Sequence, residues 1–266
     1  MTTIIQPLRL FKILLIGDEC EDIYRFGLCT RLSPESPVPV FKELSCERRP
    51  GMSANVRENL KSFGHDIIHV SNKQKITKTR FVEKRFFQHL LRVDNEQPLD
   101  PLRCDDIEWD NLHTQNLDAI VISDYSKGFV DSSAVEKCLS LGKKLSIPMI
   151  VDTKKTDLSI FKGCIIKINQ HEFEKITSFP AKYDLIVTMG AHGARWKESI
   201  FPAENSSVYD VCGAGDVFLA AFVHKFLEST GDFKGSIEFA NTCALKSVQN
   251  FGTYILTKED IDDVCS

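Results

Sequence analysis

Short apolar runs alternate with helix-like stretches along most of this chain, and no other feature constrains the fold as strongly. The apolar runs, rich in Leu, Ile and Val, cover about residues 11–18, 66–71, 117–125, 147–153, 164–169 and 183–190. Helix-like stretches cover about residues 53–63, 132–145, 172–176, 217–229 and 235–249. Continuous apolar strands are typical of a parallel sheet that helices cover on both faces. The sequence therefore predicts an α/β three-layer sandwich with a mostly parallel central sheet.

Two segments break this alternation. VPVFKEL (38–44) and ITKTRFVEKRFFQHLLRVDN (76–95) read as shorter, amphipathic strands with few helices between them. We interpret them as a small β-flap that projects from the sheet as a lid, with segments at about residues 20–45 and 75–95. A length of 266 residues suits one large domain, and no linker or repeat is visible, so we expect a single domain over residues 1–266.

Composition excludes several classes of protein. The chain is 42% hydrophobic and 26% charged with a net charge of −4, which gives no reason to expect nucleic-acid or membrane binding. No apolar run approaches the ~18 residues of a membrane span, and the first residues lack the pattern of a secretory signal. Nine cysteines make an odd count without a Cys-x-x-Cys motif, so we expect buried thiols in a cytoplasmic protein.

Polar residues follow the predicted strands one after another. Asp18, Asp124, Asp152, Asn169 and Thr188 each stand at or next to the carboxyl end of an apolar run. Any one of them could simply mark a strand end. Because ligands bind at the carboxyl ends of strands in open α/β sheets, the recurrence predicts a polar crevice there.

The stretch YDVCGAGDVFLAAFV (209–223) is the strongest chemical signal. Gly213, Ala214 and Gly215 leave the backbone amides unobstructed at the start of a helix, which favours an anion. A carboxylate at Asp216 repels an anion, but it suits a general base that takes a proton from a hydroxyl attacking a phosphate. The alternative is a helix N-cap beside a glycine turn.

These residues also resemble a known family. DVCGAGD (210–216) is similar to the signature of the ribokinase-like (PfkB) sugar kinases, with Val211 in place of threonine. RPGMSANV resembles a second motif through Gly51 and Asn55, although Met52 replaces a glycine. Asn169 to Glu172 match an N-x-x-E motif, and residues 188–193 match a T-x-G-x-x-G turn. The resemblance implies transfer of the γ-phosphate of ATP to a sugar hydroxyl, with Mg²⁺.

One branch of the family is the most similar. RLSPESPVPV (31–40), KTRFVEKRFFQHLLRVDNE (78–96) and VISDYSKGFV (121–130) resemble the D-glycero-D-manno-heptose 7-phosphate kinases, the kinase half of the bifunctional heptose enzyme. The likeness runs from about Lys12 to Thr253. It implies phosphorylation of the anomeric hydroxyl to give the 1,7-bisphosphate for nucleotide-heptose and surface-glycan synthesis. No nucleotidyltransferase half follows Ser266, so we expect activation of the product by a separate enzyme.

The resemblance assigns roles to single residues. It implies that Asp216 is the catalytic base and that the sugar is held by Asp18, Gly51 and Asn55, with an anion hole made by Gly213, Ala214 and Gly215. It implies that Asn169 and Glu172 act on Mg²⁺ through water. On the nucleotide side it implies roles for Thr188, Gly190, Gly193, Asp210, Asn241 and Gly252, with Asp210 ordering the loop or a metal-bound water.

A substrate phosphate needs a cationic grip, and arginine suits phosphate through its planar fork. The candidates are Lys78, Arg80, Arg92 and Lys154, and the alternative for each is a solvated surface charge. The flap also carries exposed edges and apolar residues, among them Phe81, Phe86 and Leu90. Relatives often pair through this flap, so we expect a homodimer.

Some features depart from the family pattern. The stretches before residue 183 and between Gly193 and Tyr209 are short, so we expect one peripheral helix and part of a hairpin to be absent. Met52 places bulk where the backbone normally approaches the sugar. Two alternatives therefore stay open: a kinase of another sugar or sugar phosphate, and a catalytically silent sugar- or nucleotide-binding regulator. His65 and His69 have no acidic or cysteine partners at the spacing of a zinc site, so we do not expect zinc there.

Cys212 is either a small side chain that fills space in the glycine loop or a reactive thiol.

Overall fold

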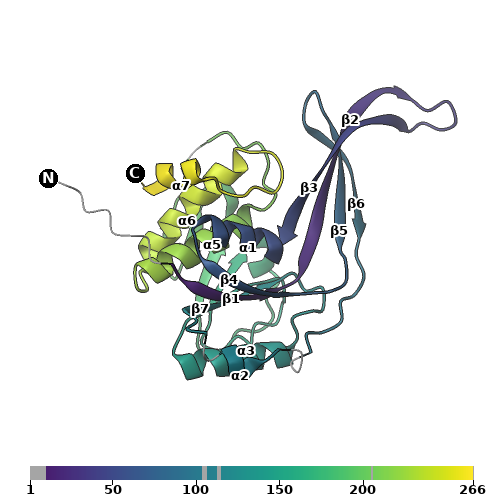
Figure 1. Cartoon of the computed structure of the whole chain (residues 1–266). Helices are drawn as coiled ribbons and strands as arrows, with labels where there is room; N and C mark the ends of the chain where they lie inside the picture. The colour runs from purple at the N-terminus through teal and green to yellow at the C-terminus, as the bar shows by residue number, and fades with distance from the viewer. Residues whose placement is uncertain (1–9, 104–106, 113–114, 205, 266) are drawn as a thin grey trace.

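The computed structural model describes residues 10–103, 107–112, 115–204 and 206–265, and these form two sheets (Figure 1). The larger sheet has the order β12-β11-β10-β9-β8-β7-β1-β4. Its strands are β1 (Lys12–Gly17), β4 (Asp66–Ser71), β7 (Ala119–Asp124), β8 (Met149–Thr153), β9 (Ile165–Asn169), β10 (Asp184–Thr188), β11 (Ala194–Trp196) and β12 (Ser199–Phe201). Six neighbouring strands of this sheet, β4, β1, β7, β8, β9 and β10, run parallel. Strands β11 and β12 add an antiparallel hairpin at one edge.

Helices cover both faces of this sheet (Figure 1). One face carries α1 (Ser53–Ser62), α5 (Ala214–Glu228), α6 (Phe233–Val248) and α7 (Lys258–Cys265), and the other carries α2 (Trp109–Leu112), α3 (Ser132–Leu145) and α4 (Gln170–Phe173). Successive side chains of one strand point to opposite faces of the sheet. Ile13 belongs to the same apolar cluster as α5, and Leu14 to the same cluster as α3. The predicted α/β sandwich is confirmed, and we call it the body.

The second sheet has four strands in the order β3-β2-β5-β6 and projects from the body (Figure 1). Its strands are β2 (Glu19–Leu32), β3 (Pro39–Met52), β5 (Thr77–Glu83) and β6 (Gln88–Asn95). We call it the flap. It includes both segments in which the sequence predicted lid strands. Its buried apolar cluster consists of Tyr24, Phe26 and Val82, against which Phe251 of the body packs.

Several boundaries differ from the sequence predictions. The sequence pattern did not show β2 as a 14-residue strand, because its acidic and apolar residues follow no simple alternation. The helix expected at 172–176 is the single turn α4, and α7 was not expected. No helix lies in residues 174–183, all of which the structure describes, and the hairpin after β10 has strands of only three residues.

Candidate active site

Asp216 lies in the first turn of α5, and its side chain is buried. Both carboxylate oxygens accept hydrogen bonds: Oδ1 from the Tyr125 hydroxyl at 2.6 Å and Oδ2 from Asn55 Nδ2 at 3.1 Å. Burial raises the pKa of Asp216 to about 6, although these two hydrogen bonds oppose the increase. The group is therefore mostly ionised at neutral pH and is a stronger base than an exposed aspartate, which suits proton transfer.

The glycine loop (residues 210–215) approaches its neighbours too closely for larger side chains. Gly213 precedes α5 with φ 78°, and a Cβ there would lie 2.8 Å from Asn55 Nδ2. At Gly215 a Cβ would lie 3.0 Å from Lys167 Nζ. The loop thus places the start of a 15-residue helix, with the positive end of its dipole, beside the predicted base. This is the arrangement that an incoming phosphate requires.

Lys167 is a functional candidate that the sequence reasoning missed. It lies in the middle of β9, fully enclosed, and its Nζ contacts Asp152 Oδ2 at 2.7 Å and the Gly215 carbonyl at 3.3 Å. Burial favours the neutral amine, but Asp152 outweighs it and raises the pKa of Lys167. The ammonium ion therefore places a permanent positive charge beside the glycine loop. A lysine within an otherwise apolar run was the signal that could have identified it.

A pocket of about 320 Å³ opens in front of the glycine loop. It is lined by β9, by the turn after β10 and by α5 and α6. Of the predicted nucleotide residues it contains Asn169, Thr188, Gly190, Gly193 and Asn241, together with Ala214 and Gly215 of the loop. The sequence-predicted nucleotide side and anion hole thus share one cavity, whose wall also includes apolar Val208, Phe218 and Leu245.

Two predicted nucleotide residues lie outside this pocket lining. Asp210 accepts hydrogen bonds from the Cys212 amide at 3.0 Å and the Gly252 amide at 2.9 Å. These bonds outweigh the effect of burial and lower its pKa, so Asp210 orders the loop as an ionised acceptor. Gly252 packs against Tyr24 of the flap and does not line the 320 Å³ pocket, so its expected place beside the nucleotide has no support in the structure.

Asn169 and Glu172 form a capping box around α4, with each side chain accepting a hydrogen bond from the other's backbone amide at 2.8 Å. Glu172 Oε1 faces Lys154 Nζ at 3.9 Å. The remaining carboxylate and amide lone pairs are hard oxygen donors that suit a hydrated Mg²⁺. Among the described residues, no three His, Cys, Asp or Glu side chains are grouped to hold a metal directly, so these residues fit a metal held through water.

Tyr125 links the predicted sugar residue Asp18 to Asp216, through its amide and its hydroxyl respectively. Asp18 is fully buried, and its Oδ2 accepts hydrogen bonds from the amides of Tyr125 and Lys127 at 2.7 and 3.2 Å. Burial and the charge of Asp124 raise the pKa of Asp18. Within the described part of the chain its Oδ1 has no hydrogen-bond partner, although it is buried. A substrate hydroxyl is the kind of donor that would satisfy it.

Gly51 and Met52 end the flap strand β3 at this point. A Cβ at Gly51 would lie 2.6 Å from both Asp22 Oδ2 and Cys20 Sγ, so only glycine fits. Met52 adopts φ 56°, a region that favours glycine, and its side chain is buried in the body's apolar cluster with Cys20 and Ile76. The methionine thus keeps a glycine-like backbone and turns its bulk into the core, which corrects the expected obstruction.

Two lysines lie near Tyr125, whose hydroxyl contacts Asp216, and a third, Lys127, shares Glu96 with one of them. Lys154 Nζ lies 4.3 Å and Lys78 Nζ 5.8 Å from the centre of the Tyr125 ring. Lys127 contacts Glu96, which also lies 3.5 Å from Lys78 Nζ. Lys127 and Tyr125 were missed as site residues, although the loop VISDYSKGFV that contains them was noted.

The two predicted arginines of the phosphate grip lie elsewhere. Arg80 is buried, contacts Asp22 Oδ1 at 2.5 Å and lies over the Tyr24 ring. Arg92 lies on the exposed strand β6 and pairs with Asp94 at 2.9 Å. In the described contacts neither guanidinium group touches Tyr125 or Asp216, so the structure gives no support for placing Arg80 and Arg92 in the phosphate grip.

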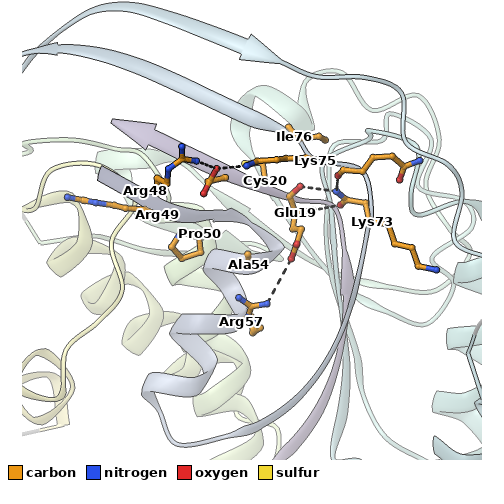
Figure 2. A pocket seen from close by; sticks show the side chains of 13 residues that line it. Glu19, Cys20, Arg48, Arg49, Pro50, Ala54, Arg57, Lys73, Lys75 and Ile76 are labelled. Carbon is orange, nitrogen blue, oxygen red and sulfur yellow. Dashed lines mark hydrogen bonds and ion pairs between the residues drawn. The ribbon is translucent and has the colours of Figure 1, made fainter. Parts of the chain in front are cut away.

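A larger pocket, about 450 Å³, lies at the base of the flap (Figure 2). Its basic residues are largely matched by carboxylates. Glu21 bridges Arg48 and Lys75 at 2.5 and 3.1 Å, and Arg57 lies 4.0 Å from Glu19 (Figure 2). This pocket is therefore crossed by ion pairs and is not a counterpart of the glycine-loop cavity.

Three further residues from the sequence analysis take structural positions. His65 contacts His224 at 3.0 Å in the body's interior, away from His69, which contacts Ser53 and Arg57. Burial, with a hydrogen bond to Asp210, raises the pKa of Cys212 to about 12, which argues against the reactive thiol.

Comparison with known proteins decides the family. Over residues 105–260, more than half of the chain, the sequence matches the family described as pfkB family carbohydrate kinase. The chain belongs to this family. Its expected enzyme class, an ATP-dependent carbohydrate kinase, is thereby confirmed. None of the described helices combines the length and apolar content that crossing a bilayer needs.

Curated relatives and solved structures agree with this assignment. The kinase is 31% identical to the bifunctional protein HldE of Campylobacter jejuni over 94% of this chain and 64% of the relative, and 27% identical to HldE of Cronobacter sakazakii over 94% and 63%. It thus spans less than two-thirds of these relatives. Phosphofructokinase-2 of Escherichia coli superposes with a TM-score of 0.72 at 15% identity, covering 96% of this chain and 98% of that one. Ribokinase of Thermotoga maritima gives 0.65 at 17%, covering 96% and 99%. These structures support the ribokinase-like fold.

Proposed function

We propose that this kinase phosphorylates the anomeric hydroxyl of D-glycero-D-manno-heptose 7-phosphate, forming the 1,7-bisphosphate. The observation that carries the chemistry is a buried carboxylate, Asp216, with a pKa of about 6 beside a glycine loop and a nucleotide-sized pocket. The choice of sugar is supported by the flap and strand-end segments that resemble heptose 7-phosphate kinases and by the bifunctional relatives reported above.

In the proposed reaction, Asp216 takes the proton of the sugar hydroxyl as its oxygen attacks the γ-phosphorus of ATP. The bond from that phosphorus to the β-bridging oxygen breaks, and ADP leaves. Tyr125 and Asn55 hold the carboxylate by their hydrogen bonds, so that its orientation is set before the substrate arrives. The glycine-loop amides and Lys167 face the migrating phosphoryl group and stabilise its charge.

We assign the substrate's own phosphate to Lys78, Lys127 and Lys154 around Tyr125. Lys154 stands between Tyr125 and Glu172 and so lies between the sugar and nucleotide sides of the site. The residues that would hold Mg²⁺, through water, are Asn169 and Glu172. When bound there, Mg²⁺ supplies positive charge to the phosphates of ATP.

The proposal also covers the assembly of the protein. Apolar side chains are exposed on the flap, with Phe86 73% and Leu91 58% exposed, and strands β3 and β6 are free edges of its sheet. A second copy of the chain would cover such a surface, which supports a homodimer through the flap.

We also propose a cytoplasmic location, where ATP is available.

The test is to incubate the protein with Mg·ATP and heptose 7-phosphate, follow ADP release and locate the new phosphate by ³¹P NMR. Asp216→Asn should lower kcat by about 10²–10⁴-fold while the protein still binds ATP. The same assay with fructose 6-phosphate and ribose separates the alternatives. Faster ADP release with another sugar overturns the heptose assignment. Thermal stabilisation by sugar without ADP release indicates a silent regulator.

A further inference from the structure

A three-residue segment between α6 and α7, Phe251–Thr253, contacts the flap on one side; we call it the strap. Arg49 of β3 donates from Nη1 to the carbonyl oxygens of Phe251 at 2.5 Å and of Thr253 at 3.2 Å. Tyr24 of β2 accepts a hydrogen bond from the Thr253 amide at 2.9 Å. Two neighbouring flap strands thus hold the same short piece of the body.

The fit between strap and flap is tight at Gly252. This residue has φ 74°, and a Cβ there would lie 2.7 Å from Tyr24 Cζ and 2.9 Å from Arg49 Nη1. Arg49 lies over the Tyr24 ring at 5.1 Å, so the two flap residues form one surface. The glycine is required here because the strap backbone itself packs against that surface.

On its other side the strap contacts the glycine loop. The Gly252 amide donates to Asp210 Oδ2 at 2.9 Å, and Asp210 Oδ1 accepts from the Cys212 amide at 3.0 Å. A Cβ at Gly213 would lie 3.3 Å from Thr253 Cγ2, which shows how closely the two backbones approach. A continuous chain of contacts therefore runs from Arg49 through the strap to the loop that precedes Asp216.

We propose that Arg49 is a positioning residue: through the strap it ties the flap to the glycine loop, so that the loop is set for phosphoryl transfer only while the flap is in place. The inference rests on the proposed kinase reaction. A guanidinium ion that binds two carbonyls in a partly enclosed site makes stronger hydrogen bonds than a neutral donor does. Release of the flap removes them and frees the strap that supports Asp210.

The neighbouring residue Arg48 provides a matched control. It lies on the same strand and pairs with Glu21 at 2.5 Å, on the side of the flap away from the strap. In Figure 2 Arg49 extends away from Arg48 and Lys75, both of which pair with Glu21. Arg49→Gln and Arg48→Gln therefore remove the same charge from adjacent positions, and only the first removes the contact with the strap.

Arg49→Gln should lower kcat roughly tenfold at saturating ATP and sugar, with both KM values changed less than about threefold, because a misaligned loop affects the transition state more than ground-state binding. Arg49→Lys should recover part of the loss, since an ammonium ion still donates to a carbonyl. Arg48→Gln should leave kcat within about twofold of the wild type. A raised sugar KM with unchanged kcat would show that Arg49 only holds the flap over the substrate, and would overturn the inference.

Hydrogen exchange of the ligand-free protein supplies a readout that does not depend on turnover. In Arg49→Gln, but not in Arg48→Gln, the amides of Cys212, Gly252 and Thr253 should exchange faster. Equal exchange in the two variants contradicts the proposal. If the wild type releases no ADP with any sugar, the proposed function fails, and the exchange comparison alone then decides whether Arg49 positions the loop.

Discussion

The body and the flap are stabilised in different ways. The body buries two apolar clusters, one on each face of its eight-stranded sheet, and helices cover both. The flap's own apolar cluster, among the described residues, is limited to Tyr24, Phe26 and Val82, with Phe251 of the body packed against it, and Phe86 and Leu91 are left exposed. By area of apolar burial the body resembles an independently stable unit, whereas a four-stranded ribbon with so small a core does not.

The same contrast applies to function. Asp216, Lys167 and the glycine loop belong to the body and are held by buried partners. The flap contributes Gly51, at the end of β3, and Lys78 toward the sugar side. In the proposed reaction, the chemistry therefore belongs to the region with buried partners and substrate access to the region with few buried contacts, which is the usual division between a catalytic core and a lid.

The largest expected effect on stability concerns the body's buried histidine pair. The Phe11 amide donates to His65 Nδ1, which leaves Nε2 of His65 to donate to His224 Nδ1 at 3.0 Å. Burial lowers the pKa of both histidines to about 4. As pH falls, these histidines take up protons in the unfolded chain at a higher pH than in the folded chain. Their contribution to the free energy of unfolding should therefore be complete above about pH 6.5. It should be lost as the pH drops toward 4, by about 3–5 kcal/mol.

Urea unfolding between pH 7.5 and 4 measures this loss. His224→Phe keeps an aromatic ring against Phe63, which stacks on His224 at 4.3 Å, and removes one of the two titrating groups. Its stability should therefore fall less steeply over the same range, while His69, whose pKa burial also lowers to about 4, titrates in both proteins. A wild-type stability that stays constant from pH 6.5 to 4 would contradict the assignment of neutral, buried imidazoles.

The second effect is catalytic and also belongs to the body. Lys167→Met should lower kcat about a hundredfold, because the ammonium ion beside Gly215 no longer stabilises the migrating phosphoryl group. Lys155→Met is the control, since Lys155 pairs with Asp124 at 2.7 Å and makes no contact with the glycine loop in the described contacts. Steady-state kinetics at saturating substrates should show kcat within about threefold of the wild type for this control. Equal losses in both variants would assign Lys167 a structural role only.

The body could be predicted from the sequence in some detail because strands buried on both faces leave uninterrupted apolar runs. Residues 132–145 form a helix as predicted, and Asp216 follows directly on the glycine loop, of which Ala214 and Gly215 line the 320 Å³ pocket. What local patterns could not provide was the pairing of distant residues. The partner of Arg80 is Asp22, 58 residues away, so an arginine that seemed available for phosphate is already bound.

The sequence predicted that a flap exists, but it did not predict all of the flap's strands, for a related reason. Strand β2 reads ECEDIYRFGLCTRL, and its buried acid Asp22 is acceptable only because Arg80 of β5 faces it. Tyr125 and Lys127 were missed because their importance depends on Asp216 and Glu96, which come from other parts of the chain. Lys167 was the exception, since a cation within IIKIN was visible and should have indicated a buried charge.

The third prediction tests whether the flap depends on the body. Phe251 contacts the rings of Tyr24, Phe26 and Phe87 at 5.4–5.6 Å. Phe251→Ala should destabilise the docked flap by about 2 kcal/mol, less than a fully buried Phe→Ala change. Hydrogen exchange should then increase across β2 and β5 while β1 and β7 keep their protection. Uniformly faster exchange in both sheets would show that flap and body unfold as one unit.

The smallest expected effect concerns the exposed apolar face of the flap. Phe86 is 73% exposed, so Phe86→Ser removes little buried surface and should change the stability of the monomer by less than about 0.5 kcal/mol. If the proposed homodimer forms through this face, the same change should shift the protein toward monomer in sedimentation velocity. Phe179→Ser is the matched control, because Phe179 is an exposed phenylalanine, 40% exposed, far along the chain from the flap. It should leave the association state unchanged. A dimer that is equally strong in both variants would place the interface elsewhere, and the flap would then rely on the body alone for its stability.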